Sequence, residues 1–340
     1  MANVAINGLG RIGRAAFKII LDTPKLDLVA VNDIVPASNL AYLLKYDTVY
    51  GRYPKDVSSE EDALIIDGKR YPVYTEKDPA QLPWDELGVD IVFECTGVFT
   101  TLEQLEKHIQ AGAKYVLLSA PAKDEKVPTV VHGVNTLSGD TRVFSCASCT
   151  TNNISPVVEI LDRRVGIKKA LMTTIHAYTS TQAIVDSPAK KVRRGRAGAA
   201  NLVPTTTGAA IATTKALPKM EGKFDGVAVR APVPDGSIAD LTMVMERATS
   251  VEEINNIFRE EAQTERYKGI LVAEGDPIVS SDIIGNSAAS IVDLEMTQVV
   301  DGDLVKVMTW YDNEWGYTNQ MVREAVRVVE NLEKAGLRIS

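Results

Sequence analysis

Cysteine is scarce in this 340-residue chain, and long apolar runs and an excess of positive charge are missing. Its three cysteines (Cys95, Cys146 and Cys149) are too few, and odd in number, for a disulfide framework, which favours a reducing compartment. The longest uncharged run, residues 197–214, holds five Thr and falls short of the roughly 20 mostly apolar residues that cross a bilayer. The N-terminus lacks the basic segment of a signal peptide. We therefore expect a cytoplasmic protein with no membrane contact.

The charge balance excludes another class. Lys and Arg number 37 against 45 Asp and Glu, and the net charge of −8 disfavours a dedicated nucleic-acid binder. No group of His, Cys and carboxylate residues has metal-ligand spacing, so we predict no metal. With 45% hydrophobic and 24% charged residues the composition is that of a globular protein, and 340 residues favour two domains.

The first part of the chain alternates between strand and helix patterns. Asp67-Gly68 separates two apolar stretches and predicts a hairpin. The expected strands are residues 4–7, 28–31, 91–93 and 115–118, and the expected helices are residues 10–21 and 102–110. This β-α-β alternation predicts a doubly wound parallel sheet, an α/β domain of the Rossmann type.

The pattern changes after Thr151. One helix, residues 152–164, precedes strand candidates at residues 171–176, 227–230, 241–246, 290–294 and 304–311. Runs of strands predict an α+β domain with a mostly antiparallel sheet. Ser250 and Glu253 have capping-box spacing for a helix to about residue 263, and a last helix, residues 320–334, is expected to stop at Gly336.

A glycine-rich turn follows the first strand. Gly8-Leu-Gly10-Arg11-Ile12-Gly13 opens a helix, and Asp33 lies 20 residues after Gly13, at the end of the second strand. In a dinucleotide-binding unit the glycines allow the tight turn and close backbone approach to the pyrophosphate, and the carboxylate binds the ribose hydroxyls. We therefore predict an adenine dinucleotide site here.

Cys149 and His176 form a candidate catalytic pair. Cys149 is expected at a helix N-terminus, where the helix dipole lowers the pKa of a thiol, and His176 ends an apolar run. A thiolate–imidazolium pair is one interpretation; a buried structural cysteine and histidine is the other. His108 and His132 are interpreted as structural.

A basic segment, residues 187–200, carries five Lys and Arg and no acid, and Thr205-Thr-Thr207-Gly208 follows it. The segment is either a solvated loop or an anion site. Arg230, at the end of a strand, is a further candidate ligand of the same anion.

Several long motifs resemble phosphorylating glyceraldehyde-3-phosphate dehydrogenase from residue 2 to the end of the chain. The most specific are Ala147-Ser-Cys-Thr-Thr-Asn152 and Trp310-Tyr-Asp-Asn-Glu-Trp-Gly-Tyr317. Weaker ones are Asn7-Gly-Leu-Gly-Arg-Ile-Gly-Arg14, Val31-Asn-Asp33, Lys45-Tyr-Asp47, Glu94-Cys-Thr-Gly97, His176-Ala-Tyr-Thr179 and Thr205-Thr-Thr-Gly-Ala-Ala210.

The resemblance implies a reaction and an assembly. Glyceraldehyde 3-phosphate would be oxidised with NAD and inorganic phosphate to 1,3-bisphosphoglycerate in glycolysis or gluconeogenesis, normally in a homotetramer. Cys149 would attack the aldehyde, His176 would act as general base while hydride passes to the nicotinamide, and phosphate would cleave the resulting thioester. The NAD-binding domain would comprise residues 1–148 with the helix of residues 314–340 packed on it, and the catalytic and oligomerisation domain residues 149–313.

The resemblance also implies binding residues. Substrate and attacking phosphate would be held by Ser148, Thr150, Thr179, Thr181, Arg194, Thr207, Gly208 and Arg230. The cofactor would be held by Gly8, Gly10, Arg11, Ile12, Gly13, Asp33, Lys77, Thr96, Gly97, Ser119, Asn313 and Tyr317. NAD is expected over NADP, because Asp33 would repel a 2′-phosphate, and Pro188 agrees with this preference whereas Ser187 is found with NADP use.

The chain departs from the family in places. Asn153 stands where many members have a second cysteine, Tyr50 stands where a His is common, and the sequence after Arg230 is unusual. The alternative within the class is erythrose-4-phosphate dehydrogenase, which hydrolyses the thioester; Thr206-Thr-Gly-Ala-Ala210 fits the phosphorylating enzyme better. A third alternative, RNA binding through the basic segment, is disfavoured by the net charge.

Overall fold

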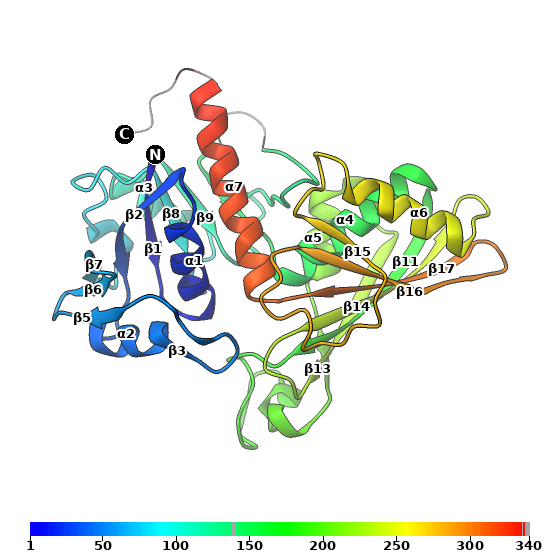
Figure 1. Cartoon of the computed structure of the whole chain (residues 1–340), viewed down its shortest axis with the longest axis horizontal. Coiled ribbons are helices and arrows are strands. Elements are labelled where there is room, and N and C mark those ends of the chain that lie inside the picture. The colour runs from blue at the N-terminus through cyan, green and yellow to red at the C-terminus, as the bar shows by residue number, and fades with distance from the viewer. Residues whose placement is uncertain (138–140, 335, 337–340) are drawn as a thin grey trace. The chain divides into compact units, whose positions relative to one another are not determined.

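The computed structural model describes residues 1–137, 141–334 and 336, which form two compact units, each with its own sheet and core (Figure 1). The first unit comprises residues 1–130, 137–147 and 321–340, and the second comprises residues 131–136 and 148–320. Of the predicted C-terminal helix of residues 314–340, residues 335 and 337–340 lie outside the described part.

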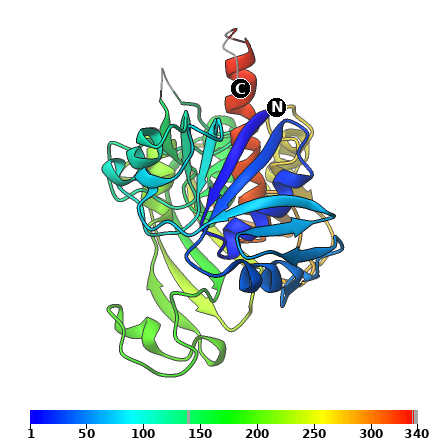
Figure 2. The same cartoon turned by 90° about the vertical axis from the view of Figure 1, so that its left-hand side faces the viewer.

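The first unit contains an eight-stranded sheet in the order β10-β9-β8-β1-β2-β7-β6-β5, whose twisted strands face the viewer in Figure 2. Its strands are β1 (Ala2–Asn7), β2 (Leu26–Asn32), β5 (Val57–Ser59), β6 (Ala63–Ile66), β7 (Lys69–Tyr74), β8 (Ile91–Glu94), β9 (Tyr115–Leu118) and β10 (Val143–Ser145). Strands β10 to β7 in that order pair in parallel, and β7, β6 and β5 pair antiparallel. A small separate hairpin joins β3 (Tyr46–Asp47) to β4 (Gly51–Arg52).

Helices α1 (Arg11–Leu21), α2 (Ala37–Lys45), α3 (Leu102–Gln110) and the larger part of α7 (Trp315–Lys334) belong to this unit, with a short 3₁₀ turn, η1 (Pro79–Gln81). Apolar residues of α1, α2 and α7 share one core with the sheet, whereas Leu105 of α3 packs in another with β9 and β10. The predicted hairpin is present between β6 and β7, and Asp67 and Gly68 both have positive φ, as a type I′ turn requires. The predicted Rossmann-type α/β fold is confirmed.

The second unit has a seven-stranded sheet in the order β12-β13-β11-β14-β17-β16-β15, of which four pairs are antiparallel and two are parallel. Its strands are β11 (Ile167–Ala177), β12 (Val203–Thr206), β13 (Phe224–Ala231), β14 (Ser237–Met245), β15 (Leu271–Glu274), β16 (Ser290–Val300) and β17 (Leu304–Tyr311). The α-helices are α4 (Cys149–Arg164), α5 (Ala209–Ala216) and α6 (Val251–Ala262), and the 3₁₀ turns are η2 (Val192–Gly195), η3 (Gly198–Ala200) and η4 (Pro218–Met220). The three α-helices pack on one face of the sheet in a shared core (Figure 1). The mostly antiparallel sheet is confirmed.

Two helices begin earlier than the sequence predicts. Helix α4 starts at Cys149 instead of residue 152, because Ser148 caps it and its polar first turn is buried by tertiary packing that intrinsic propensity does not reveal. Helix α7 starts at Trp315 instead of residue 320. Its first turn is stabilised by the Asp312 carboxylate, which accepts hydrogen bonds from the Glu314 and Trp315 N–H groups. Both changes bring predicted site residues into a first helical turn.

Candidate active site

The predicted cofactor residues of the first unit meet at the carboxyl edge of its parallel sheet. Strand β1 lies between β8 and β2, so the chain leaves β1 and β8 at a point where the strand order reverses, and α/β sheets bind ligands at such points. A groove of about 390 Å³ opens there. It is lined by Asn7, Gly8, Gly10, Asn32, Asp33, Ile34, Glu76, Lys77, Cys95, Thr96, Val98 and Phe99.

The glycine-rich turn is built for close backbone approach. Gly8 has a φ of +92°, and a Cβ atom there would lie 2.8 Å from the backbone nitrogen of Thr96. A Cβ on Gly13 would lie 1.9 Å from the Gly8 carbonyl oxygen, so helix α1 packs directly against the turn. Gly10 is the residue before α1, and its Cα faces open space. These residues fit a pyrophosphate held on the N–H groups at the start of α1.

Asp33 is held rigidly in the groove. Its carboxylate accepts hydrogen bonds from the Leu9 N–H (2.7 Å) and the Val35 N–H (3.1 Å). Beside it, the side chains of Ile34 and Val98 are 67% and 63% exposed, and together with Phe99 they form an apolar wall that suits an adenine ring. Sequence reasoning missed this wall, although the apolar residue directly after Asp33 was a usable signal.

The other predicted cofactor residues are placed differently. Lys77 and Thr96 line the groove, whereas Arg11, Ile12, Gly97 and Ser119 do not. The Arg11 guanidinium lies 2.5 Å from the Asp47 carboxylate and 5.6 Å from the centre of the Tyr50 ring, so it contacts the β3–β4 hairpin. Asn313 and Tyr317 belong to the second unit.

In the second unit, Cys149 and His176 lie together. Cys149 is the first residue of α4, after Ser148, whose hydroxyl accepts a hydrogen bond from the Thr151 N–H at 3.1 Å. His176 lies near the end of β11 and is buried. The Cys149 Sγ atom is 3.3 Å from His176 Nε2, within the reach of a nucleophile and its base.

The charges of this pair differ from the ion pair considered from the sequence. Burial raises the pKa of Cys149 to about 11, although the Arg230 cation and the Thr150 hydroxyl and N–H act to lower it. Burial, followed by the positive charge of Arg230, lowers the pKa of His176 to about 3. Both pKa shifts favour the uncharged forms, a thiol beside a neutral imidazole, because burial disfavours charge on either group.

Arg230 is the cation closest to the pair. Strands β11 and β13 run parallel with His176 opposite Arg230. The Arg230 Nη1 atom lies 2.5 Å from His176 Nδ1 and 3.0 Å from the Ala177 carbonyl oxygen, and its buried Nε has no hydrogen-bond partner among the described residues. The Ala177 carbonyl oxygen also lies 2.7 Å from His176 Nδ1 and can only accept, which favours the tautomer with the ring proton on Nδ1 and leaves Nε2 unprotonated toward the thiol.

Sequence reasoning missed Tyr311 and Thr174. The Tyr311 hydroxyl lies 2.8 Å from both the Thr150 and the Thr174 hydroxyls, and its ring packs edge-on to the His176 ring with centres 5.9 Å apart. Tyr311 thereby fixes the first turn of α4 and the His176 ring from behind. Its place in the long motif of residues 310–317 was the available signal.

The predicted anion-binding residues form two groups. Thr179, Thr181 and Arg194 are linked: the two hydroxyls are 2.9 Å apart, and Arg194 donates to the Thr181 and Thr205 hydroxyls at 3.4 and 3.1 Å. Thr207 and Gly208 precede α5, and the Thr207 hydroxyl accepts from the Ala209 N–H. The Thr150 hydroxyl is turned to Tyr311 and the thiol.

Asn313 is tied to the catalytic strand. The Ser237 hydroxyl donates to Asn313 Oδ1 at 2.6 Å and accepts from the Ala177 N–H at 3.1 Å. Tyr317 is buried in the first turn of α7. Asn153, at the position of the family's second cysteine, is fully buried with its side chain 2.8 Å from the Thr309 hydroxyl, so this residue has a packing role in the core.

Known proteins match this chain in both its N-terminal and its C-terminal part. Residues 2–102 match the glyceraldehyde 3-phosphate dehydrogenase NAD binding domain, and residues 148–313 match the C-terminal domain of the same enzyme. A glyceraldehyde-3-phosphate dehydrogenase of Streptomyces coelicolor is 50% identical over 97% of this chain and 99% of its own length. The glyceraldehyde-3-phosphate dehydrogenase of Thermotoga maritima is 50% identical over 95% of this chain and 97% of its own length. That of Zymomonas mobilis is 45% identical over 97% of this chain and 99% of its own length.

The chain belongs to the glyceraldehyde-3-phosphate dehydrogenase family. The resemblance, the function and the enzyme class predicted from the sequence are confirmed: the chain is an NAD-dependent oxidoreductase of the glyceraldehyde-3-phosphate dehydrogenase family. Within the described residues, no helix is long and apolar enough to cross a membrane.

Proposed function

We propose that the chain oxidises D-glyceraldehyde 3-phosphate to 1,3-bisphosphoglycerate with NAD and inorganic phosphate, through a thioester on Cys149. The observation that carries the mechanism is the 3.3 Å contact between Cys149 Sγ and His176 Nε2 at the start of α4. A sulfur nucleophile suits this reaction because a thioester stays reactive enough for phosphate to cleave it.

His176 is in the right protonation state for a base. Its lowered pKa leaves the imidazole neutral at pH 7, so Nε2 accepts the thiol proton as Cys149 Sγ bonds to the aldehyde carbon. His176 gives this proton to the former aldehyde oxygen, which completes the hemithioacetal, and takes it back from that hydroxyl as the carbon is oxidised. Bound NAD supplies the two-electron acceptor. Attack of a phosphate oxygen on the thioester releases the product and returns Cys149 as the leaving group.

The anion-binding role of the second unit is supported by its free donors. Within the described part of the chain, the buried Arg230 Nε has no hydrogen-bond partner, and Arg194 is held by threonine hydroxyls that are themselves donors. We assign the substrate phosphate and the attacking phosphate to Ser148, Thr179, Thr181, Arg194, Thr207, Gly208 and Arg230, with Thr150 at the sulfur.

The preference for NAD over NADP rests on Asp33. Two backbone N–H groups hold its carboxylate, so it does not readily swing aside for a 2′-phosphate. Two unit charges about 4 Å apart repel by roughly 4 kcal/mol at an effective dielectric of 20, before screening. NAD is therefore the expected cofactor, held by the groove residues together with Asn313 and Tyr317.

A steady-state assay with both cofactors, with and without phosphate, tests this function. We expect turnover with NAD that requires phosphate, a several-fold lower specificity constant with NADP, and no activity in Cys149→Ser. Turnover that persists without phosphate would identify the alternative, an erythrose-4-phosphate dehydrogenase that hydrolyses its thioester. A Cys149→Ser enzyme that retains more than a few per cent of turnover would rule out the thioester.

Three wider assignments complete the proposal. Residues 1–148 with the helix of residues 314–340 act as the NAD-binding domain, and residues 149–313 as the catalytic and oligomerisation domain. A homotetramer is supported by a groove of about 750 Å³ on the sheet of the second unit, where Leu171 and Ile211 are 66% and 64% exposed. A cytoplasmic location is supported by three cysteines that are all free thiols.

A further inference from the structure

A buried carboxyl group, Glu94, lies beneath the cofactor groove and takes no part in the chemistry above. It is fully buried at the end of β8. Oε2 accepts from Asn7 Nδ2 at 2.6 Å and lies 3.2 Å from His108 Nε2. Oε1 accepts from the Thr96 N–H at 2.8 Å and from the Thr96 hydroxyl. Four donors fit a carboxylate, which only accepts.

Through these contacts Glu94 holds the lining of the groove. Thr96 packs over Gly8, and its hydroxyl accepts from the Val98 N–H at 3.1 Å. On the other side, Asn7 Oδ1 accepts from Asn32 Nδ2 at 2.7 Å, and Asn32 in turn bonds both the N–H and the carbonyl of Glu76. The walls on both sides of the groove therefore depend on the position of one carboxylate.

His108 and Trp84 fix that position from the core. Both are fully buried, and the Trp84 indole N–H donates to His108 Nδ1 at 3.0 Å. An indole nitrogen can only donate, so Nδ1 accepts and the ring proton of a neutral imidazole stands on Nε2, aimed at Glu94. The chain of contacts runs from the core at Trp84, through His108 and Glu94, to Thr96 and Asn7.

We propose that His108 is a positioning residue for NAD binding, and that Trp84 holds it in the tautomer which donates to Glu94. The sequence indicated only a structural histidine within a helix. The proposal rests on the assignment of the groove to the cofactor, and it concerns binding of NAD without any role in the reaction at Cys149. Removing the His108 donor leaves a buried carboxylate short of one hydrogen bond, so Glu94 shifts and Thr96 and Asn7 move with it.

The test is the affinity for NAD, measured by isothermal titration calorimetry, together with steady-state kinetics. In His108→Leu we expect the dissociation constant and the KM for NAD to rise about tenfold, with kcat at saturating NAD and the KM for the aldehyde within about twofold of wild type. His108→Gln, whose amide both donates and accepts, should recover most of the affinity. Trp84→Phe should weaken it about threefold.

Leu105→Ala is the matched control, because Leu105 is fully buried on the same helix in an apolar cluster that contains neither Glu94 nor His108. It should lower thermal stability and leave the NAD dissociation constant unchanged. An unchanged constant in folded His108→Leu, or an equal rise in Leu105→Ala, would overturn the proposal. If His108→Leu does not fold, an unchanged NAD dissociation constant in folded Trp84→Phe overturns it instead. Wild-type turnover with NAD tests the proposed function separately.

Discussion

Arg230 sets the charge balance around the reactive sulfur. Its Nη1 touches His176 Nδ1, and its positive charge lowers the pKa of both Cys149 and His176. The two effects have different consequences. The cation favours the charged thiolate form of Cys149, whereas it favours the uncharged form of His176. A single guanidinium thereby keeps the base neutral and stabilises the anion that the base creates.

Replacement of Arg230 by Gln should therefore slow thiol alkylation. The rate of Cys149 alkylation by iodoacetamide follows the thiolate fraction, so in the wild type it rises with pH towards the raised pKa of about 11. Without the cation the pKa of Cys149 rises further. At any pH below the pKa, each further pKa unit lowers the alkylation rate about tenfold. The measurement is the alkylation rate from pH 6 to 10.

Lys191→Gln serves as the control for this change, because it removes the same charge from an exposed side chain that bonds only the Thr206 hydroxyl among the contacts described. Its profile should match the wild type. If the Arg230→Gln profile also coincides with the wild type, Arg230 is not coupled to the thiol.

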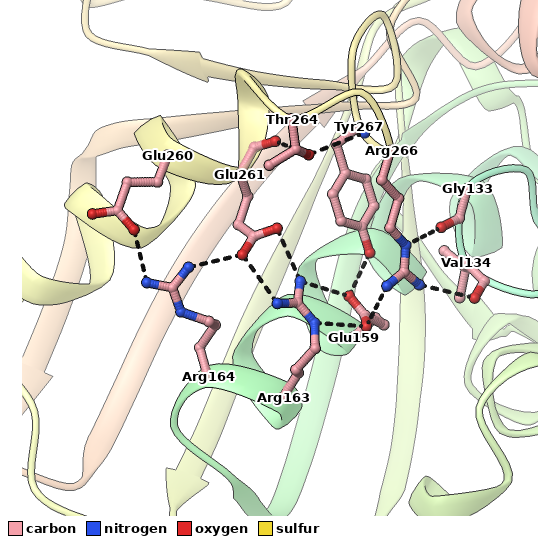
Figure 3. A network of polar contacts seen from close by, with 10 residues as sticks. All are labelled: Gly133, Val134, Glu159, Arg163, Arg164, Glu260, Glu261, Thr264, Arg266 and Tyr267. Carbon is pink, nitrogen blue, oxygen red and sulfur yellow. Dashed lines mark hydrogen bonds and ion pairs between the residues drawn. The ribbon is translucent and has the colours of Figure 1, made fainter.

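At the scale of the elements, helix α4 is fixed at both ends. Its first turn carries Cys149, and its last turns carry Glu159, Arg163 and Arg164, which join an ion-pair network with α6 (Figure 3). Glu261 of α6 accepts from Arg163 (2.9 and 3.1 Å) and Arg164 (2.8 Å). Burial acts to raise the pKa of Glu261, but the two guanidinium groups outweigh it and lower the pKa.

The network extends beyond the two helices. Glu159 accepts from Arg163, Arg266 and the Tyr267 hydroxyl, and Arg266 also donates to the Gly133 and Val134 carbonyl oxygens. Figure 3 shows the Arg266 side chain between Glu159 and these carbonyls. The C-terminal end of helix α4 is thus anchored to three separate segments of the second unit.

We expect Glu261→Gln to lower the free energy of unfolding by about 1–3 kcal/mol, because two guanidinium groups lose a shared carboxylate whose side chain is only 6% exposed. Since the pKa of Glu261 is lowered in the folded state, its contribution is present above the unfolded pKa and is lost as pH falls. Chemical denaturation of wild type and variant at pH 7 and pH 4 measures this loss of unfolding free energy, which should be smaller at pH 4.

Glu260→Gln provides the comparison for this network. Glu260 is the neighbour of Glu261 and has a 63% exposed side chain with one ion pair, to Arg164. Exposed pairs contribute little, so its loss should cost less than about 1 kcal/mol. Equal effects of the two substitutions would mean that burial of Glu261 adds nothing to the network.

At the scale of the molecule, one sheet face of the second unit remains uncovered. Helices α4, α5 and α6 share a core on the opposite face, and the groove is lined mainly by residues of β11, β13, β14 and β17, together with Ile211 of α5, which is not part of that core and is 64% exposed. Exposed apolar side chains that lie together, as Leu171 and Ile211 do in this groove, are unfavourable in water and are typical of subunit contacts. The face is therefore the surface on which the proposed homotetramer depends.

Leu171→Glu combined with Ile211→Glu should shift the assembly towards smaller species, because association would bury two unpaired carboxylates. Sedimentation velocity at micromolar concentration measures the change. Val251→Glu, at an exposed apolar position on α6 outside the groove, should sediment like the wild type. A double variant that still sediments as the wild type does would show that the contacts lie elsewhere.

The sequence by itself was enough to predict the two folds, the dinucleotide fingerprint and Cys149 and His176 as a candidate pair, and the structure places these two side chains in contact. Gly8, Gly13 and Asp33 are identifiable because their roles depend on local backbone geometry and fixed spacing, and the same is true of the Asp67-Gly68 hairpin. Cys149 was identifiable through its place before a helix and in a long specific motif. Such features are encoded in a few neighbouring residues.

Only the tertiary structure decided the charges and the supports of these sites. Burial raises the pKa of Cys149 and lowers that of His176, so it favours the uncharged form of both groups. Tyr311 comes to His176, and Trp84 and Glu94 come to His108, from elements distant in sequence. Desolvation and hydrogen bonding depend on the groups that surround an atom in three dimensions, and those groups are set by the packing of strands and helices that no local pattern specifies.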